Sequence, residues 1–585
     1  MKLSFFKSKK FIAGTIILVA LTVTLLVIPY PPIRPRTIPI DDYTYAIDFT
    51  KYELSRLQKK EKLPCTAVGL IVGNETIYQE VAGLSNIEEN IEADLSTIFK
   101  MGSISKLFTA IEIMRLYEEG LVDLDVPITT YLPDFEINSR FNDSDPITIR
   151  NILAHRSGLP RNHNLPQWAW DNNTYVLRDM VASLKESYVA YPANQQFKYS
   201  NIGFTILGRI IEVVTGEWFA FRMRDSLLHP IGMNSSGFIS SLIPSSSKIA
   251  VGYFREGRNN IPYNQFDIID MASGGMYSTI EDMNDFAKFI INRGKVDGIN
   301  LINDTTLSMM YESNFSKPSD PQQIGMSFFV DRSYLPNNEL AVFHAGTNQG
   351  TISIIAFAPE QQLAVILISN SEAFEDDSKY LAMEILEIMH ETKTGIKKQK
   401  VSYEKQDVNV EILQNYIGKY AIEGDIANVY LSWSKLKIKY MDYTLRLKPI
   451  NDTTFIADHW LIDIGDIKVK FFTDFLILSI EGLHNPICPI YSPNEELIDY
   501  WLSYLGNYQA WQRHYSLYTG EEVPDSIQLY YEEGVLQLSW SNFILQPISQ
   551  TELIILSGPF EGELMFRDTN TNFIYWQNRV FKPIM

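Results

Sequence analysis

Cysteine is almost absent from this chain, and histidine is scarce. The only cysteines among 585 residues are Cys65 and Cys488, which lie in segments of different texture. Two separated thiols can form neither a disulfide framework nor a cysteine-based metal site. The eight histidines are scattered, and the closest pair, His155 and His163, lacks the spacing of metal ligands on a helix. We therefore expect neither a metal ion nor disulfide support for the fold.

Basic residues are outnumbered: 50 lysines and arginines face 70 aspartates and glutamates, for a formal net charge of −20. A surface of this sign repels phosphate backbones, which argues against nucleic acid as a partner. The hydrophobic content of 45% and the charged content of 21% are those of a globular protein. A chain of 585 residues is long enough for about two to four domains.

Charge is also missing from one long stretch near the N-terminus. Residues 11–30 carry no charged side chain, and four lysines precede them within residues 1–10. An apolar run of 20 residues is long enough for a helix to cross about 30 Å of hydrocarbon. The excess of lysine on its N-terminal side predicts a cytoplasmic tail (1–10), a single transmembrane anchor (11–30) in the cell membrane and an outward-facing stalk (31–45). A cleaved signal peptide is the alternative, and it leaves the rest of the chain on the same outer side.

Strand and helix signals alternate from about residue 46 to residue 395, which predicts one mixed domain. Apolar runs at 66–72 and 76–78 flank the turn Gly73-Asn74-Glu75, which predicts a hairpin. The remaining signals are two long helical patterns closed by glycine, two further strands around a turn, and a final helix: 106–119, 201–214, 351–357, 363–369 and 376–391.

The sequence pattern changes after residue 400, where short alternating aromatic and β-branched runs replace helical periodicity. A weak repeat runs through this tail: Tyr-x-Gly-x-Tyr, then Leu-Ser-Trp-Ser, then Leu-x-Pro-Ile, with copies starting at Tyr416 and Tyr504. We interpret the tail as two antiparallel β-units, 405–490 and 495–585. Closure of such sheets into barrels would remove their exposed edges.

A Ser-x-x-Lys tetrad occurs at Ser103 and Lys106. The same spacing recurs elsewhere in the chain, but only this copy follows a strand-like run, at 98–102, and opens a strongly apolar helix. A serine at a helix N-terminus lies among backbone N–H groups that can stabilise an oxyanion. A lysine three residues on lies one turn up the same face, where burial lowers its pKa and lets it act as a base. A serine that only caps the helix is the plainer interpretation, and it stays open at this point.

Tyr199 and Asn201 form the only Tyr-x-Asn among the 32 tyrosines, just before the second long helical pattern. A phenolate near a lysine can accept a proton from a serine hydroxyl. An asparagine side chain can hold a substrate amide. Capping of the helix by Asn201 is the structural alternative, and the two roles are compatible.

The third element is His344-Ala345-Gly346-Thr347, which leads into the strand expected from residue 351. A glycine on a strand lets a substrate backbone approach closely. A literal Lys-Thr-Gly occurs at 393–395, but it ends a predicted helix, where Gly395 suits a left-handed cap, and no strand follows it. We therefore reject the copy at 393–395 and assign the element to His344 and Gly346.

Serine with lysine, Tyr-x-Asn and His-x-Gly, in this order and spacing, resemble the three motifs of the class C β-lactamase and penicillin-binding-protein-like serine hydrolases. Further stretches match the same pattern: 151–160, 229–233, 272–276 and 278–282. The resemblance covers residues 46–395, and the tail is similar to the lipocalin-like β-barrels of D-aminopeptidases. It implies an α+β fold of the β-lactamase/transpeptidase type, in which an antiparallel sheet flanked by helices packs on an α domain and the site lies between them.

The resemblance also implies a role for each motif residue. Ser103 would attack a carbonyl and form an acyl-enzyme, and Lys106 and Tyr199 would manage its proton. The backbone N–H groups of Ser103 and Thr347 would form the oxyanion hole, and no metal or organic cofactor would be needed. The residues implied to bind substrate are Asn201, His344, Gly346 and Thr347.

These inferences predict a membrane-anchored serine hydrolase that cleaves an ester or amide, including D-amino-acid peptides, in a small-molecule or short-peptide substrate. A D-Ala-D-Ala carboxypeptidase or β-lactamase is one alternative, and a catalytically silent binding or sensing protein of the same fold is another. Because an imidazole is mostly neutral at pH 7, His344 holds a carboxylate less well than lysine would, which favours esters or amides over β-lactams. We expect the tail to shape or shield the mouth of the site without supplying a catalytic group.

Overall fold

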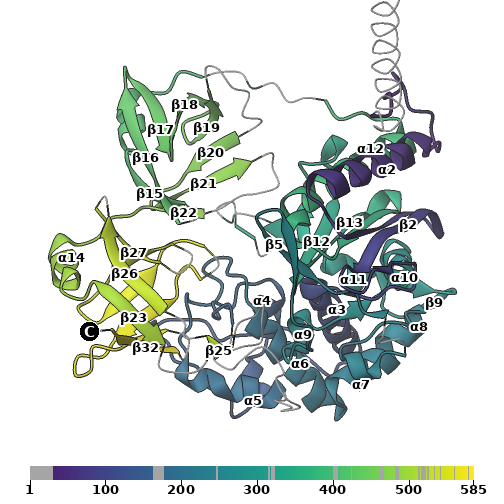
Figure 1. Ribbon diagram of the computed structural model, residues 1–585, viewed down its shortest axis with the longest axis horizontal. Helices are drawn as coiled ribbons and strands as arrows, with labels where there is room; N and C mark the ends of the chain where they lie inside the picture. Colours follow the sequence, from purple (N-terminus) through teal and green to yellow (C-terminus); the bar gives the residue numbers. More distant parts are fainter. Residues whose placement is uncertain are drawn as a thin grey trace, which may run out of the picture.

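Figure 1 shows a mixed body of helices and sheet with two further β-units beside it. The computed structural model describes residues 31–585 apart from 163–176, 245–247, 314–315, 318–319, 321–322, 400–402, 404–405, 423, 460–466, 481–486, 511–513, 516–521, 524–525, 533, 540–541, 559, 577–578 and 585. The predicted cytoplasmic tail (1–10) and transmembrane anchor (11–30) lie outside the described residues and stay predictions. Within the described part of the chain, each helix is too short or too polar to cross a bilayer.

An antiparallel sheet of eight strands forms the centre of the mixed body. Its strands follow one another in the order β10 (Gln323–Ile324), β11 (Phe329–Asp331), β12 (Ala341–Asn348), β13 (Thr351–Ala358), β14 (Leu363–Ser369), β1 (Cys65–Val72), β2 (Glu75–Asn86) and β3 (Ile91–Glu92). β13 and β14 confirm the strands predicted at 351–357 and 363–369. The predicted hairpin is also confirmed, since β1 and β2 pair around Gly73 and Asn74. The central strands are buried because they carry near-continuous apolar runs.

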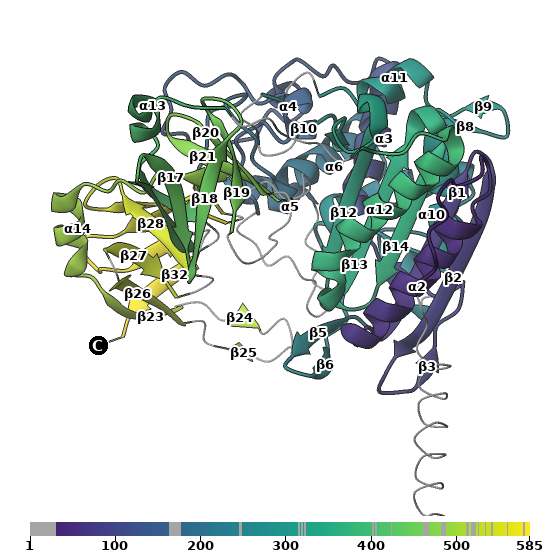
Figure 2. The same cartoon turned by 90° about the horizontal axis from the view of Figure 1, so that it is seen from above.

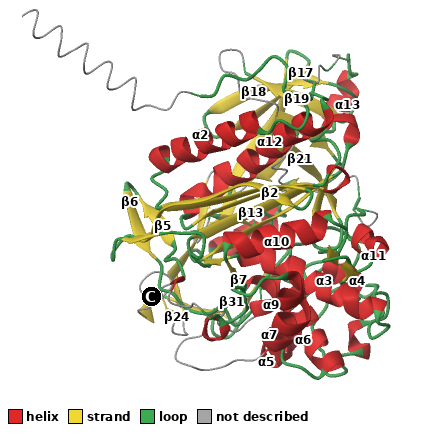
Figure 3. Ribbon diagram, turned by 90° about the vertical axis from the view of Figure 1, so that its right-hand side faces the viewer, coloured by secondary structure: helices red, strands yellow, loops and turns green. Residues whose placement is uncertain are grey.

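Helices cover both faces of this sheet (Figures 2 and 3). α2 (Thr44–Lys60) and α12 (Glu375–Thr394) lie on one face, and α10 (Ile280–Ile291) lies on the other. Alternate side chains of β14 point into two separate apolar clusters, so Leu367 packs towards α12 and Ile366 towards α10. α12 closes at Gly395 with a left-handed φ of 70°. This confirms that the Lys-Thr-Gly at 393–395 is a helix end.

Residues 31–43, most of the predicted stalk, pack beside the end of α12. Ile38 is buried in the cluster on that face of the sheet, and Arg34 forms an ion pair with Glu391. The stalk is therefore not a free tether over this length. Its proline-rich composition gave no sign that Ile38 and Tyr43 attach it to this cluster.

Helices, most of them short, form a mainly α-helical domain beyond α10. They follow α3 (Ser105–Glu118) in the order α4 (Ile149–Leu153), α5 (Leu177–Ala182), α6 (Asn201–Thr215), α7 (Phe219–Met223), α8 (His229–Ile231), α9 (Met271–Gly274) and α11 (Asp304–Met309). α3 and α6 confirm the two long helices predicted at 106–119 and 201–214. Gly216, with a φ of 73°, ends α6 as predicted.

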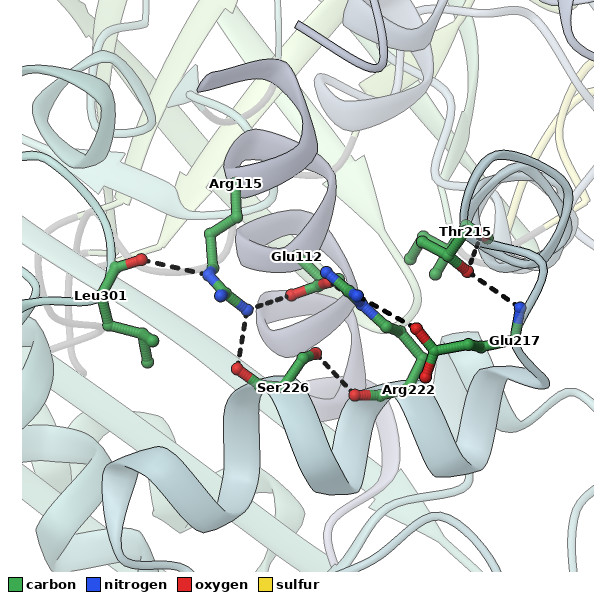
Figure 4. Close-up of polar contacts among 8 residues, drawn as sticks. Glu112, Arg115, Thr215, Glu217, Arg222, Ser226 and Leu301 are labelled. Atoms are coloured by element: carbon green, nitrogen blue, oxygen red, sulfur yellow. Dashed lines mark hydrogen bonds and ion pairs between the residues drawn. The ribbon is translucent and has the colours of Figure 1, made fainter. Parts of the chain in front are cut away.

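A buried carboxylate holds α3 in place (Figure 4). Glu112 is fully buried, and it pairs with Arg115 on its own helix and with Arg222 from α7, each at 2.6 Å. A buried charge without partners is strongly destabilising, so these pairs fix α3 against α7. The helix that is fixed in this way carries the Ser-x-x-Lys tetrad at its start.

Two antiparallel β-units follow the mixed body. The first is a sheet of β15 (Gly418–Ile422), β16 (Asp425–Ser432), β17 (Lys435–Tyr440), β18 (Tyr443–Pro449), β19 (Thr454–Asp458), β20 (Ile467–Phe471), β21 (Phe475–Ile480) and β22 (Ile487–Pro489). A bridge between Tyr420 and Ile490 joins its two edges. The second is a closed barrel of β23 (Gly506–Ala510), β26 (Ser526–Glu532), β27 (Val535–Leu538), β28 (Phe543–Pro547), β29 (Glu552–Ile555), β30 (Leu564–Arg567), β31 (Ile574–Trp576) and β32 (Arg579–Pro583).

Two of the three repeat marks fall at equivalent places in the two units. Tyr-x-Gly-x-Tyr leads into the first strand of each, after the short helices α13 (Val410–Gln414) and α14 (Glu495–Leu502), and Leu-x-Pro-Ile ends the fourth. Leu-Ser-Trp-Ser is not equivalent, and its use as a repeat mark is wrong. At 431–434 it ends the second strand and forms the following turn, whereas at 538–541 it begins at the end of the third strand. Similar residue types occur at both places because each is the end of a strand.

Candidate active site

Ser103 lies on a tight turn between a short strand and α3. β4 (Phe99–Lys100) pairs with β7 (Tyr277–Ser278), and the 3-10 turn η1 (Gly102–Ile104) follows β4. Gly102 has a φ of 52°, and a Cβ there would lie 2.6 Å from the backbone nitrogen of Thr347. Ser103 occupies neither helix-capping position, so the interpretation in which it only caps the helix is wrong. The turn leaves Ser103 half-buried at the edge of a cavity.

Lys106 is fully buried next to Ser103. Its Nζ lies 3.1 Å from Ser103 Oγ and donates a 2.7 Å hydrogen bond to the backbone carbonyl of Ser273. Burial lowers the pKa of Lys106, and the neighbouring Tyr199 opposes that shift. An amine whose charged form is disfavoured is suited to accept a proton from a hydroxyl in contact with it.

Tyr199 lies against Lys106, and two further groups contact its ring. The Nζ of Lys106 is 4.9 Å from the ring centroid, and the guanidinium of Arg161 is 5.1 Å from it. The ring of His155 stacks on it at 4.3 Å. Burial holds the pKa of His155 well below its usual value, so this imidazole is neutral at pH 7. The guanidinium, the amine and the neutral imidazole therefore hold the phenol in position.

Asn201 is the first residue of α6 and not its cap. Ser200 Oγ performs the capping, because it accepts the backbone N–H of Gly203 at 3.0 Å. The capping role considered for Asn201 is therefore wrong. The Asn201 side chain donates to Asn162 Oδ1 at 2.8 Å, and the residue lines the cavity.

β12 presses against the turn that carries Ser103. A Cβ at Gly346 would lie 2.1 Å from the backbone carbonyl oxygen of Met101, and Ser353 on β13 donates to the same oxygen at 2.9 Å. The approach of these two protein segments is therefore enough to require glycine at this position. Thr347, the next residue, is exposed and lines the cavity, which places its backbone beside the turn.

His344 lies two residues before Gly346 but does not line the cavity. Its side chain is 1% exposed. Nδ1 donates a 2.7 Å hydrogen bond to the Ala345 carbonyl, and Nε2 has no hydrogen-bond partner among the described residues. Burial, and then the charge of Lys106, lower the pKa of His344 to about 3. The imidazole is therefore neutral at pH 7 and carries its proton on Nδ1.

A cavity of about 230 Å³ opens beside these side chains. Its lining consists of Ser103, Asn201, Tyr263, Ile268, Asp270, Ser273, Gly274, Thr347, Asn348 and Gln349. Three predicted site residues are in that lining: Ser103, Asn201 and Thr347. Lys106 and Gly346 are buried directly behind it. The structure therefore gathers the three motifs around one small space, with His344 set back from it.

Sequence reasoning missed Asp270, a buried carboxylate in this lining. Asp270 accepts hydrogen bonds from the hydroxyls of Thr205 and Ser273, and burial raises its pKa. It thereby fixes the residue whose carbonyl binds Lys106. Its only sequence signal was its place just before the stretch at 272–276 that matches the family pattern.

Lys100, on β4 just before the turn that carries Ser103, is a second residue that the sequence did not indicate. It is buried, and its ammonium group donates to the side chain of Gln349, which lines the cavity. Burial lowers the pKa of Lys100 to about 7. No motif marks Lys100 or Gln349, because their contact joins segments about 250 residues apart.

Comparisons with known proteins agree with the family that the three motifs indicate. A profile of the β-lactamase family matches residues 53–390, which is more than half of the chain. The chain is 24% identical over 313 residues to Protein flp of Staphylococcus aureus (strain N315), a match of 53% of this chain and 60% of that protein. It is 25% identical over 321 residues to the Unguisins hydrolase ungD' of Aspergillus campestris, with 53% and 59% covered. The chain thus spans about three fifths of the length of these curated relatives.

Two solved structures resemble this one over most of its length. The octameric penicillin-binding protein homologue from Pyrococcus abyssi superposes with a TM-score of 0.53 at 20% identity, over 76% of this chain and 100% of that chain. SurE superposes with a TM-score of 0.54 at 18% identity, over 76% and 99%. At these identities the likeness establishes the fold, and it confirms the α+β catalytic fold followed by barrel-like β-units. Together with the profile match, it shows that the chain belongs to the β-lactamase family, whose members are serine hydrolases, as the three motifs predict.

Proposed function

We propose that this protein is a serine hydrolase that cleaves an ester or amide bond, including those of D-amino-acid peptides, through an acyl-enzyme on Ser103. One observation carries the proposal: the buried amine of Lys106 lies 3.1 Å from Ser103 Oγ, and burial lowers its pKa. Membership of the β-lactamase family supports the same chemistry, and one similar protein is named as a hydrolase. The predicted anchor at 11–30 would place this activity on the outer side of a cell membrane.

In the proposed acylation step, Ser103 Oγ bonds to the carbonyl carbon of the substrate. The hydroxyl proton passes to the amine of Lys106, because burial disfavours the charged form of that amine and it lies within hydrogen-bond distance. The backbone N–H groups of Ser103 and Thr347 stabilise the oxyanion. The scissile bond then breaks, and the leaving oxygen or nitrogen takes up the proton through Lys106 and Tyr199.

Water completes the proposed cycle. Its oxygen bonds to the acyl carbon, the bond to Ser103 Oγ breaks, and one proton returns to Ser103 by way of Lys106. Asn201, which lines the cavity, is placed to hold an amide of the substrate. These steps use side chains and backbone groups of this chain alone.

We also propose a preference for substrates without a free carboxylate next to the scissile bond. The neutral His344, with a pKa of about 3, supplies no positive charge at the position where lysine is usual in relatives that cleave β-lactams. The single N–H of this neutral imidazole already donates to the Ala345 carbonyl, so His344 offers a substrate carboxylate neither a positive charge nor a free donor. A panel of neutral esters, D-amino-acid amides and β-lactams tests this preference. Faster turnover of β-lactams than of simple esters by the wild-type protein contradicts it.

Covalent labelling by a fluorophosphonate probe tests the proposed nucleophile. We expect the wild-type chain to be labelled on Ser103, as identified by mass spectrometry, and Ser103→Ala to lose both labelling and hydrolysis. Loss of one member of a catalytic unit lowers turnover by as much as about 10⁶-fold. Ser432→Ala is the matched control, because Ser432 starts another Ser-x-x-Lys, on β16. Near-normal activity in Ser103→Ala refutes the assignment, and a folded wild-type chain that is never labelled indicates a silent protein.

A further inference from the structure

A turn of the second barrel lies against the wall of the candidate site. This turn, at residues 560–563 between β29 and β30, closes by a 3.0 Å hydrogen bond from the Glu563 N–H to the Phe560 carbonyl. It meets the segment that leads into Tyr199, on the side of the mixed body that faces the second barrel (Figure 1). Gly562 has a φ of 81°, and a Cβ there would lie 2.4 Å from Cζ of Tyr191. Only glycine allows this approach.

Two buried charges meet at this contact. Lys198, the neighbour of Tyr199 in the chain, donates a 2.8 Å hydrogen bond to the backbone carbonyl of Glu561 and lies 3.5 Å from Glu563 Oε1. The side chains of Lys198 and Glu563 are 6% and 5% exposed. Charges buried this deeply stabilise each other, because removal of either one takes away charge compensation that water does not replace. The carboxylate of Glu563, from the second barrel, therefore belongs to the buried structure beside the site.

The same carboxylate reaches two site residues through Arg161. Glu563 Oε1 accepts the backbone N–H of Arg161 at 3.0 Å, and the Arg161 carbonyl accepts the backbone N–H of Asn201 at 2.7 Å. The guanidinium of Arg161 lies 5.1 Å from the ring centroid of Tyr199. One barrel side chain is thus connected, through Arg161, to the backbone of Asn201 and to the ring of Tyr199.

We propose that Glu563 is a positioning residue for Tyr199 and Asn201, so that the second barrel completes the wall of the active site. The proposal rests on the hydrolase function proposed above. Glu563 is absent from the lining of the cavity and acts through Lys198 and Arg161. Its loss lets these two segments shift, which slows acylation more than it weakens binding, because most of the cavity lining lies elsewhere in the chain.

The experiment compares Glu563→Gln with wild type in the full-length protein, using a fluorophosphonate probe over a range of concentrations. We expect the maximal rate of Ser103 labelling to fall about tenfold, while the probe concentration for half-maximal rate stays the same. Lys198→Gln gives a similar loss, and the double variant loses no more than either single variant, because both changes break one contact. Glu532→Gln, which removes an exposed carboxylate of β26 in the same barrel, keeps the wild-type rate.

Circular dichroism and thermal unfolding establish that each variant is folded. If Glu563→Gln does not fold, Gly562→Ala displaces the same turn without removing a charge, and it must show the same loss of maximal rate. An unchanged maximal rate in folded Glu563→Gln, or additive losses in the double variant, overturns the positioning role. Absence of labelling in the wild-type chain contradicts the hydrolase function itself, so the two failures are distinguishable.

Discussion

Burial acts on Lys106 and His344 in the same direction, because each side chain is a base whose charged form loses its hydration. Their surroundings then differ. Tyr199 opposes the shift at Lys106, whereas the charge of Lys106 adds to the shift at His344. β12 and α3 thus place two bases close together. Burial keeps His344 neutral, whereas Tyr199 partly offsets the effect of burial on the pKa of Lys106.

The buried His344 predicts a stability that depends on pH. Its folded pKa of about 3 lies below the usual 6.5, so between these values the unfolded chain binds the extra proton. The stability present above pH 6.5 is therefore lost as the pH falls towards 3. In His344→Gln this loss is absent, and from pH 7 to pH 5 the wild-type protein loses about 2 kcal/mol relative to the variant. Urea unfolding at the two pH values measures the difference.

His229→Gln is the control for this experiment, because the His229 side chain is 45% exposed on α8. Its free energy of unfolding relative to wild type should stay constant between pH 7 and pH 5. A constant difference for His344→Gln as well shows that the imidazole is not held neutral by burial.

Local sequence spacing predicts Ser103, Lys106 and Tyr199 as site residues, but it does not predict the residues that hold them in place. Ser103 and Lys106 are one helical turn apart, and Tyr199 precedes a helix that its own sequence predicts. Asp270 and Glu563 owe their roles to contacts 65 residues and about 400 residues away in the chain. No periodicity or motif encodes such contacts, so only the folded structure shows them.

Among the helices, strands and turns, the close approach of β12 and the turn at Ser103 has the greatest effect on the shape of the site. Both segments carry glycine at the contact, and both glycines face backbone atoms of the other segment. Backbone atoms cannot move aside like the end of a side chain, so the separation of the two segments is set by the absence of two Cβ atoms. The sequence indicated Gly346 as a site residue but gave no sign of this packing contact.

Gly346→Ala tests this contact. The added methyl meets the Met101 carbonyl oxygen, whose distance from the Cβ position is 2.1 Å. We expect a loss of about 1–3 kcal/mol in the free energy of unfolding. We also expect labelling of Ser103 to slow about 100-fold, because the turn and β12 are forced apart. Thermal unfolding and the labelling rate measure the two effects.

Gly418→Ala on β15 is the matched control, since its new Cβ meets only Tyr420 Cε2, at 3.7 Å. That variant should keep the wild-type labelling rate. If Gly346→Ala also labels at the wild-type rate, the turn tolerates displacement of β12 and the packing argument fails.

Long elements were predictable from the sequence, and most short ones were not. The hairpin β1–β2, the helices α3, α6 and α12, and the strands β13 and β14 all carry enough apolar residues for their periodicity to be visible. β4 and β7 are two residues each and hold the turn at Ser103 by pairing across the fold. The strand-like run at 98–102 indicated β4, whereas β7 has no pattern of its own because its conformation depends on its partner strand.

At the scale of the whole molecule, the attachment of residues 31–43 decides how an anchor would hold the protein. Arg34 pairs with Glu391, and Ile38 is buried near the same end of α12. A membrane segment ending at residue 30 would therefore hold the mixed body close to the bilayer, with no long flexible tether between them. The anchor and its orientation are predictions from the sequence.

Protease treatment of sealed cells that produce the full-length chain tests this orientation. The four lysines at residues 2, 7, 9 and 10 precede an uncharged run, and lysine-rich flanks stay in the cytoplasm. We therefore expect external protease to digest residues 46–585 and to spare only the anchor and its short tail. Replacement of the four lysines by glutamine, with four lysines inserted after residue 36, should invert the orientation and protect the catalytic body. Protection of residues 46–395 in the wild-type chain shows that the body lies inside, and the anchor prediction is then wrong.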